Sequence, residues 1–122
     1  MELPNVGDIA WVEFDPAFGT EQAGRRPALV LTPRAYHQRS RRTIVCPITS
    51  NARPWPWNVN LPRGLKTGGV VLVDQIRTIE RAQRMFGIIE TAPAELVAEV
   101  FGKLISLLGI NQIEIGGGAD IR

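Results

Sequence analysis

The chain has 122 residues, enough for one domain with a buried core, and a net charge of +2 at neutral pH. Its apolar content of 44% argues against general disorder, and no apolar run approaches the roughly 18 to 20 residues of a membrane span. The single cysteine, Cys46, excludes an internal disulfide, and the N-terminus has no basic region followed by an apolar stretch. We therefore expect a cytoplasmic protein without a secretory signal and without membrane association.

Charge is distributed unevenly along the chain. Residues 1–24 carry five acids and no base, whereas residues 25–84 carry eleven Arg and one Lys against two acids. Residues 85–122 are acidic again, with five acids and two bases. A central block so rich in Arg favours an anionic partner. Charge alone leaves a solvated basic surface as the alternative.

Short apolar segments bounded by Gly and Pro predict a series of β-strands. We expect strands at 8–14, 27–32, 43–49, 59–61, 70–74 and 86–90, with 75–79 continuing or pairing with the strand before it. Residues 15–26 and 50–58 are predicted to be long loops, and 33–42 a polar connection. Pro27 suits the first position of a strand, and Pro47 indicates an edge or a bulge in the third strand.

The hydrophobic period then changes from 2 to 3.6, which predicts a helix over 93–108. The apolar face of this helix consists of Leu96, Val97, Val100, Phe101, Leu104, Leu107 and Leu108. Thr91 suits the N-cap, Pro93 the first turn and Gly109 the C-cap. We expect a single domain, mainly β with a C-terminal helix, with a core over 7–109 and a flexible tail at 116–122.

Several kinds of catalysis are not expected from this sequence. One His and one Cys cannot supply a zinc site, and no acidic cluster resembles a two-metal site. No glycine-rich motif for nucleotide phosphates is present, so we expect neither a metal nor an organic cofactor. His37 lies in a basic connection with no acid near it in sequence and is predicted to be a surface residue. Cys46 lies in an apolar run and is predicted to be a core thiol.

The loop Glu-Gln-Ala-Gly-Arg-Arg-Pro at 21–27 is the first segment with distinctive chemistry. It contains an acid, an amide and two guanidinium groups. Arg has a permanent charge and a planar set of donors that matches phosphate. Because loops on a rigid β scaffold often carry function, this loop is predicted to bind phosphate.

The loop at 50–58 is the second such segment. Trp55 and Trp57 flank Pro56, and aromatic faces stack on unpaired bases. The alternation suggests that one indole points inward and one outward, without indicating which. Arg53 suits a phosphate, and the amides able to read base edges are Asn51, Asn58 and Gln75. Gln75 could equally satisfy a backbone group.

Four blocks of the sequence, in this order and spacing, resemble the MazF/PemK family of toxin endoribonucleases. They are GDIAWVEFDP at 7–16, EQAGRRPALVL at 21–31, VCPITS at 45–50 and VVLVDQIRTI at 70–79. The resemblance runs from Gly7 to Leu108. It implies an SH3-like barrel, a homodimer, and metal-independent, sequence-specific cleavage of single-stranded messenger RNA that inhibits translation and growth. It also implies a cognate antitoxin with an acidic, partly disordered segment that blocks the RNA site.

On the matching positions, the family's catalytic Arg falls on Arg26, its catalytic Thr on Thr49 and its functionally sensitive Glu on Glu21. Further RNA contacts are expected from Gln22, Arg25, Ser50 and Arg77, although Arg25 could instead be a surface charge. The plasmid-borne branch has a His and an Arg at the positions of Thr20 and Leu72. The chain is therefore more similar to the chromosomal MazF branch, and this departure weakens Asp74 as a catalytic acid.

Metal-free RNA cleavage uses the 2′-OH of the substrate as nucleophile and leaves a 2′,3′-cyclic phosphate and a 5′-OH. In that reaction Arg26 would stabilise charge on the phosphate, Thr49 would donate a hydrogen bond, and Glu21 would accept the proton or orient an arginine. The alternatives are a structural ion pair for Arg26 and an ordinary strand-end hydroxyl for Thr49. At the level of function, the alternatives are a non-catalytic toxin that poisons a protein such as DNA gyrase, or a plain RNA-binding module.

Overall fold

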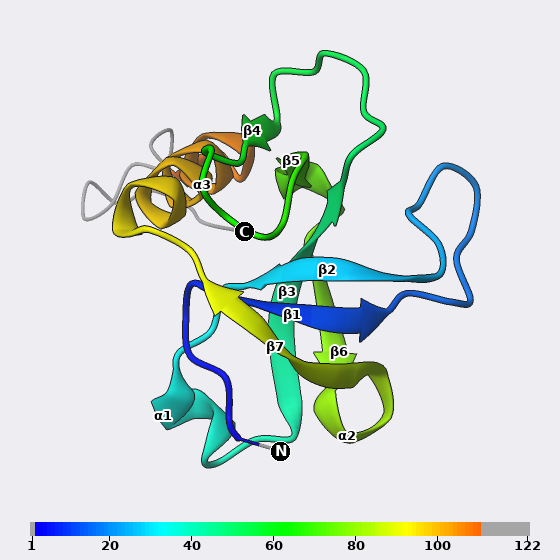
Figure 1. Cartoon of the computed structure of the whole chain (residues 1–122), viewed down its shortest axis with the longest axis vertical. Helices are drawn as coiled ribbons and strands as arrows, with labels where there is room; N and C mark the ends of the chain where they lie inside the picture. Colours follow the sequence, from blue (N-terminus) through cyan, green and yellow to red (C-terminus); the bar gives the residue numbers. More distant parts are fainter. Residues whose placement is uncertain (1, 111–122) are drawn as a thin grey trace, which may run out of the picture.

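The computed structural model describes residues 2–110, so the tail predicted at 116–122 lies outside the described residues. The strands are β1 (Asp8–Glu13), β2 (Arg25–Val30), β3 (Arg42–Thr49), β4 (Asn58–Asn60), β5 (Val70–Leu72), β6 (Arg77–Glu80) and β7 (Met85–Thr91). The helical segments are α1 (Arg34–His37), the 3-10 turn η1 (Val73–Gln75), α2 (Arg81–Arg84) and α3 (Ala94–Leu107). The predicted mainly β fold with a C-terminal helix is thus confirmed (Figure 1).

The strands form one antiparallel sheet in the order β4-β5-β3-β2-β1-β7, with β6 also paired to β3. Among the described residues β4 and β7 do not pair with each other, so the sheet curls without closing into a complete barrel. The long β1–β2 and β3–β4 loops extend away from the sheet (Figure 1). No helix within residues 2–110 is long and apolar enough to cross a membrane.

Strand β3 differs from its prediction because it lies inside the sheet. Its pairing with β2 extends as far as Pro47, which pairs with Ala28, and shows no register shift, so neither the edge nor the bulge is present. On its other side β3 pairs with β6 over residues 42–45 and with β5 at Ile48 and Thr49. Pro47 falls between these two partners, where its missing N–H interrupts neither recorded pairing. The segment after β5 turns through η1 before β6 begins, so β6 pairs with β3 and does not extend β5.

The central strands are buried on both faces, which explains why they read as continuous apolar runs. Neighbouring residues of β1 and β2 point to opposite sides: Ile9 and Leu29 belong to one core cluster, and Ala10 and Ala28 to the other. The first cluster includes Cys46, which is confirmed as a core thiol, and it is covered by α3 (Figure 1). Burial raises the pKa of the Cys46 thiol to about 12, so it stays protonated.

The residues that cap the two ends of α3 differ from those expected from the sequence. Pro93 occupies the N-cap position, so the prediction of Thr91 as N-cap is wrong. Thr91 is the last residue of β7, and its hydroxyl donates to Asp8 Oδ1 at 2.8 Å. At the other end, the helix stops at Leu107 and the C-cap is Leu108, so the prediction of Gly109 as C-cap is wrong by one residue. Gly109 follows the cap with a positive φ of 69° and donates its N–H to the Ser106 carbonyl.

The prediction of His37 as a surface residue is also wrong. His37 ends α1 and is 3% exposed, because the N-terminal segment folds over it. Its Nδ1 donates to the Pro4 carbonyl at 2.8 Å, and its Nε2 accepts from the Thr32 hydroxyl at 2.7 Å. Burial is the main cause of a lowered pKa for His37, and the nearby Arg81 and Arg34 charges act in the same direction. The imidazole is therefore a neutral structural group.

Candidate functional site

Strand β2 begins at Arg25, two residues before the predicted start at Pro27. The reason lies in β1, which offers Glu13 and Val12 as partners to Arg25 and Arg26. The pairing of β2 with β3 starts at Ala28, so the missing N–H of Pro27 interrupts no bond to β3. The two arginines predicted to lie in a loop therefore stand on a strand, which holds their backbone more firmly than a loop would.

The register between β2 and β3 brings Arg26 next to Thr49. Ala28 pairs with Pro47, and continuing that antiparallel register by two residues places Arg26 level with Thr49. Arg26 and Thr49 accordingly line the same cavity, of about 700 Å³. We call it the Arg26 cavity.

The polar groups of this pair are oriented by local hydrogen bonds. Arg26 donates from Nε to the Ala23 carbonyl at 2.9 Å, which fixes the base of the guanidinium group. Thr49 is 6% exposed, and its Oγ1 accepts the backbone N–H of Asn51 at 3.2 Å. Because that oxygen is acting as an acceptor, its own proton remains available to a ligand. The cavity therefore presents a fixed cation and a hydroxyl donor together, which suits a phosphate.

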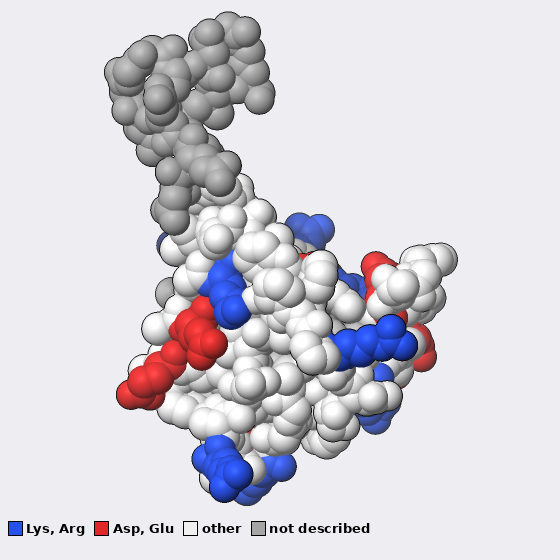
Figure 2. Space-filling view, turned by 90° about the horizontal axis from the view of Figure 1, so that it is seen from above, with Lys and Arg blue, Asp and Glu red and all other residues white. Residues whose placement is uncertain are grey.

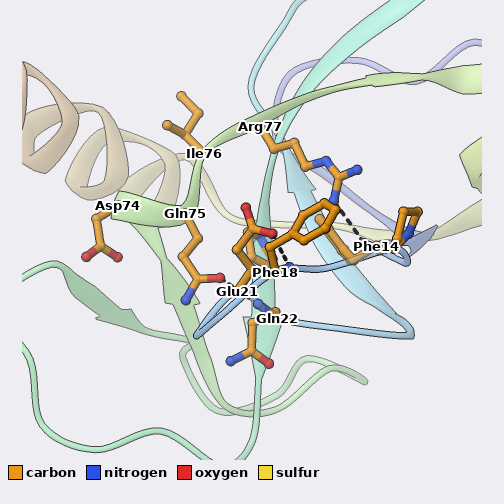
Figure 3. Close-up of a pocket in the computed structure, with 10 residues that line it drawn as sticks. Phe14, Phe18, Glu21, Gln22, Asp74, Gln75, Ile76 and Arg77 are labelled. Atoms are coloured by element: carbon orange, nitrogen blue, oxygen red, sulfur yellow. Dashed lines mark hydrogen bonds between the residues drawn. The ribbon is translucent and has the colours of Figure 1, made fainter.

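Two further cavities extend this site. The middle cavity, of about 410 Å³, shares Thr49 with the Arg26 cavity. The third, of about 380 Å³, shares Gln22, Asp74 and Gln75 with the middle one (Figure 3). We call the three adjacent cavities the groove.

Most of the predicted RNA-binding residues line the groove. Those in the Arg26 cavity are Arg25 and Ser50, those in the middle cavity are Asn51, Arg53, Trp55 and Asn58, Arg77 lines the third cavity, and Gln22 and Gln75 line both the middle and the third. Trp57 is half-buried and lines none of these three cavities, whereas Trp55 is 54% exposed. Trp55 is therefore the outward indole of the pair.

Glu21 does not lie beside Arg26 in this structure. It lines the third cavity, at the opposite end of the groove. Its Oε1 accepts the backbone N–H of Phe18 at 2.6 Å, a bond that closes the β1–β2 loop on itself. Figure 3 shows Glu21 next to Phe18, with Arg77 above them. The Arg77 guanidinium donates from Nη1 to the Phe14 carbonyl at 2.9 Å, which holds its side chain against the start of the β1–β2 loop.

Two other predicted residues have structural partners. Gln75 accepts the backbone N–H of Gln22 through its Oε1 at 2.8 Å, so the expected alternative of a backbone partner is the one observed (Figure 3). Its amide NH₂ group has no recorded partner among residues 2–110 and remains available to a ligand. Arg25 places its guanidinium 3.7 Å from the centre of the Phe86 ring, a cation–π contact.

Charged side chains are dispersed on the face of the molecule that Figure 2 shows. Seen from above, separate clusters of Lys and Arg and of Asp and Glu lie around a broad uncharged surface, and the Lys and Arg side chains do not merge into one patch (Figure 2). Within residues 2–110, no group of three or more His, Cys, Asp and Glu side chains is placed to hold a metal ion. The side chains that line the groove include guanidinium groups, one ammonium, two carboxylates, amides, hydroxyls and exposed indoles.

A family model described as PemK-like, MazF-like toxin of type II toxin-antitoxin system matches residues 5–108. The chain belongs to this family. Endoribonuclease toxin MazF of Escherichia coli K12 is 42% identical over 77 residues, which cover 63% of this chain and 68% of that protein. Endoribonuclease PemK of Escherichia coli is 40% identical over 106 residues, covering 84% of this chain and 80% of that protein.

Solved structures of MazF proteins agree with the fold. The crystal structure of MazF from Deinococcus radiodurans is 45% identical, with a TM-score of 0.85, and the match covers 89% of this chain and 99% of that one. A MazE–MazF structure from the same organism is 41% identical, with a TM-score of 0.77 and the same 89% coverage of this chain. The MazF-like fold predicted from the four sequence blocks is therefore confirmed.

One segment that lines the Arg26 cavity in this MazF-like chain was not predicted from the sequence. It is the β4–β5 loop, which contributes Lys66, Thr67, Gly68 and Gly69. Lys66 adds a third cation to the cavity, beside Arg25 and Arg26, but in sequence it is an isolated lysine in a polar turn. Only the folding of the loop back over β3 shows that Lys66 belongs with Arg26.

Hydrogen bonds to Glu90 of β7 anchor this β4–β5 loop. The Glu90 carboxylate accepts the backbone N–H groups of Lys66 and Thr67 at 2.9 and 2.8 Å, and the Thr67 hydroxyl at 2.7 Å. Desolvation is the largest single influence on Glu90 and raises its pKa, but these hydrogen bonds and the Lys66 charge outweigh it. The net pKa of Glu90 lies below its ordinary value, so folding favours its charged form.

We expect Glu90→Gln to lower the melting temperature by a few degrees at pH 7. Because the folded-state pKa of Glu90 is lowered, its contribution is present above the unfolded pKa of about 4.3 and is lost as pH falls through the lower folded value. The difference between wild type and E90Q should therefore shrink on acidification below about pH 4. Thermal unfolding from pH 7 to pH 3 measures it, with the exposed Glu99→Gln as control. A difference that persists unchanged at pH 3 would contradict this account.

Proposed function

We propose that this chain is a toxin that cleaves single-stranded messenger RNA at specific sequences without a metal ion. The observation that carries the proposal is that Arg26 and Thr49 line one cavity. The curated relatives named endoribonuclease support it, since four of them are at least 40% identical over the matched residues. Cleavage of messenger RNA would stop translation and growth, and we propose that the protein acts in the cytoplasm.

In the proposed reaction the 2′-oxygen of the substrate attacks the adjacent phosphorus. The bond between the 2′-oxygen and phosphorus forms, the bond from phosphorus to the 5′-oxygen breaks, and the products are a 2′,3′-cyclic phosphate and a 5′-OH. A base accepts the proton of the 2′-OH, and the leaving 5′-oxygen takes a proton. Arg26 stabilises the charge that builds on the phosphate oxygens, and the Thr49 hydroxyl donates to one of them.

Glu21 is the proposed base, and its position sets a condition on that role. It lies at the far end of the groove from Arg26, with its carboxylate bonded to the Phe18 N–H. To reach a 2′-OH beside Thr49, the β1–β2 loop has to rearrange when RNA binds. The loop is tied to η1 by the bond between the Gln22 N–H and Gln75, so that bond would have to shift as well.

Sequence specificity would come from the middle cavity. A base stacks on the exposed face of Trp55, Arg53 contacts a phosphate, and the amides of Asn51 and Gln75 meet base edges. Amides can both donate and accept, so they distinguish bases by the pattern of groups on the edge.

The proposed partners follow from the same surface. A MazE–MazF structure exists for the related protein of Deinococcus radiodurans, and we propose a cognate antitoxin for this chain. An acidic, partly disordered segment of such an antitoxin would compete with RNA for the cations of the groove. We also propose a homodimer. The exposed apolar side chains Trp11, Phe86, Ile105 and Leu108 offer surface for either contact.

The decisive test is cleavage of a long unstructured RNA by purified protein in excess EDTA. We expect cutting at a small set of short sequences, with 5′-OH ends and 2′,3′-cyclic phosphates identified by ligation-based sequencing. Cleavage that requires added Mg²⁺ would overturn the metal-free reaction. Absence of cleavage on every RNA, with or without metal, would overturn the nuclease itself and favour a non-catalytic toxin.

A further inference from the structure

The indole of Trp55 is exposed and yet held in place. Its Nε1 donates to Asp74 Oδ2 at 2.8 Å, although the side chain is 54% exposed. Asp74 is an exposed residue of η1, nineteen positions further along the chain. With the N–H engaged at one edge, the face of the ring remains open to the middle cavity, which both residues line.

The loop that carries Trp55 is tied down on both sides of this residue. Asn58 donates from Nδ2 to the Arg53 carbonyl at 2.9 Å. The N–H of Val73, also in η1, donates to the Trp57 carbonyl at 3.1 Å. Lys103 of α3 donates to the Pro56 carbonyl. An aromatic ring on a fixed backbone with a fixed edge loses little conformational freedom when a ligand stacks on it, which favours binding.

The negative charge of Asp74 suggests that this residue has a role other than contact with RNA. A carboxylate in a groove that binds RNA repels phosphate and lowers affinity, unless it acts in another way. Figure 3 shows Gln75 directed toward Gln22, while the neighbouring Asp74 is directed to the other side. The two consecutive residues of η1 thus hold the two loops of the groove, Gln75 the β1–β2 loop and Asp74 the β3–β4 loop.

The place of Trp55 along the groove indicates which part of the RNA it meets. Thr49 lines both the middle cavity and the Arg26 cavity. A base stacked on Trp55 therefore lies next to the phosphate that Arg26 and Thr49 are proposed to bind.

We propose that Asp74 is a positioning residue, which fixes the Trp55 indole as the stacking surface for an unpaired base beside the cleaved phosphate. This inference rests on the proposed function, because it assigns part of the same groove. It gives Asp74 a role that involves no proton transfer and no contact with the reacting atoms.

The test measures binding and cleavage separately. Binding uses fluorescence anisotropy with a labelled 2′-O-methyl RNA heptamer copying a mapped cut site, or a random heptamer pool if no site is found. The blocked 2′-oxygen prevents cleavage. The variants are Trp55→Ala, Asp74→Ala, Asp74→Asn and the double variant of Trp55→Ala with Asp74→Ala, with Glu99→Ala on the exposed face of α3 as control.

We expect W55A to weaken binding roughly 5- to 150-fold, the change that corresponds to about 1 to 3 kcal/mol of stacking. D74A should weaken binding less, by roughly 3- to 10-fold, and raise KM while kcat stays unchanged. D74N should bind at least as well as wild type, because an amide oxygen still accepts from the indole and the negative charge is gone. The double variant should bind no more weakly than W55A alone. The hydrogen-bonded indole N–H signal of Trp55 should persist in D74N and change in D74A.

Three results would overturn this assignment: a D74A protein that binds as well as wild type, a D74A effect that persists fully when Trp55 is absent, or a fall in kcat with KM unchanged. Failure of the proposed function is distinguishable, because it appears as loss of cleavage in wild type. If wild type cleaves no RNA but binds the heptamer with the expected variant pattern, the base-binding role stands without the nuclease. If wild type does not bind the heptamer at all, the role of Asp74 is overturned as well.

Discussion

Replacing Arg26 with Ala should lower the rate constant for RNA cleavage by about 100- to 1,000-fold, the range for loss of one preorganised group that stabilises a charged transition state. Arg26 is the cation that the β2–β3 register places level with Thr49, and its Nε bond to Ala23 holds the guanidinium in the cavity. Arg26→Lys should recover only part of the rate, because an ammonium keeps the charge but lacks the planar pair of donors. Single-turnover cleavage of a short RNA with a mapped site measures both.

The control for this prediction is Arg39→Ala. Arg39 is exposed and lies after α1, outside the groove. Arg39→Ala removes the same charge from the protein as Arg26→Ala does, so the comparison corrects for the weaker long-range attraction of RNA. R26A should unfold at a temperature close to wild type. If R26A and R39A cleave equally fast, Arg26 is not the catalytic cation.

Replacing Gly69 with Ala should destabilise the fold by about 2 to 5 kcal/mol and also reduce cleavage. Gly69 has a φ of 110°, a conformation that L side chains rarely adopt, and a Cβ there would lie 2.2 Å from the Thr49 carbonyl oxygen. Neither the backbone of β3 nor that of the loop can yield without moving Thr49 or breaking the bond from the Leu61 N–H to the Gly69 carbonyl. Chemical denaturation measures the stability, and single-turnover cleavage measures the effect on Thr49.

Gly68 is a matched control in the same loop. A Cβ at Gly68 meets nothing within 4 Å, and its φ lies outside the positive region. Gly68→Ala should therefore change stability by no more than about 1 kcal/mol. If G69A were as stable as G68A, the contact between the β4–β5 loop and Thr49 would not be as close as the structure has it.

The local patterns of the sequence were sufficient for most of the fold. Apolar runs bounded by Gly and Pro located the strands to within two residues at most ends, and the change of period located α3. These features depend on neighbours in the chain, so a single sequence reveals them. The four blocks were also enough to identify the family and to assign Arg26 and Thr49 as its catalytic positions, an assignment that remains a prediction.

Where the sequence misled, the deciding contact was distant in the chain. His37 is buried because the carbonyl of Pro4 lies against it, thirty-three positions away. Pro47 is tolerated inside the sheet because β3 changes partner there, which depends on η1 and β6. Neither circumstance leaves a local trace in sequence.

By itself, then, the sequence determined which residues of this protein can form strands and the helix, and which side chains have the chemistry to bind RNA. The tertiary structure decided which of these side chains meet. It placed Arg26 level with Thr49 through strand register, brought Lys66 to the same cavity on a loop held by Glu90, and put Glu21 at the far end of the groove. It also paired Asp74 with Trp55. The physical reason is that short-range propensity sets local structure, whereas these contacts join residues nineteen or more positions apart and form only when the sheet curls.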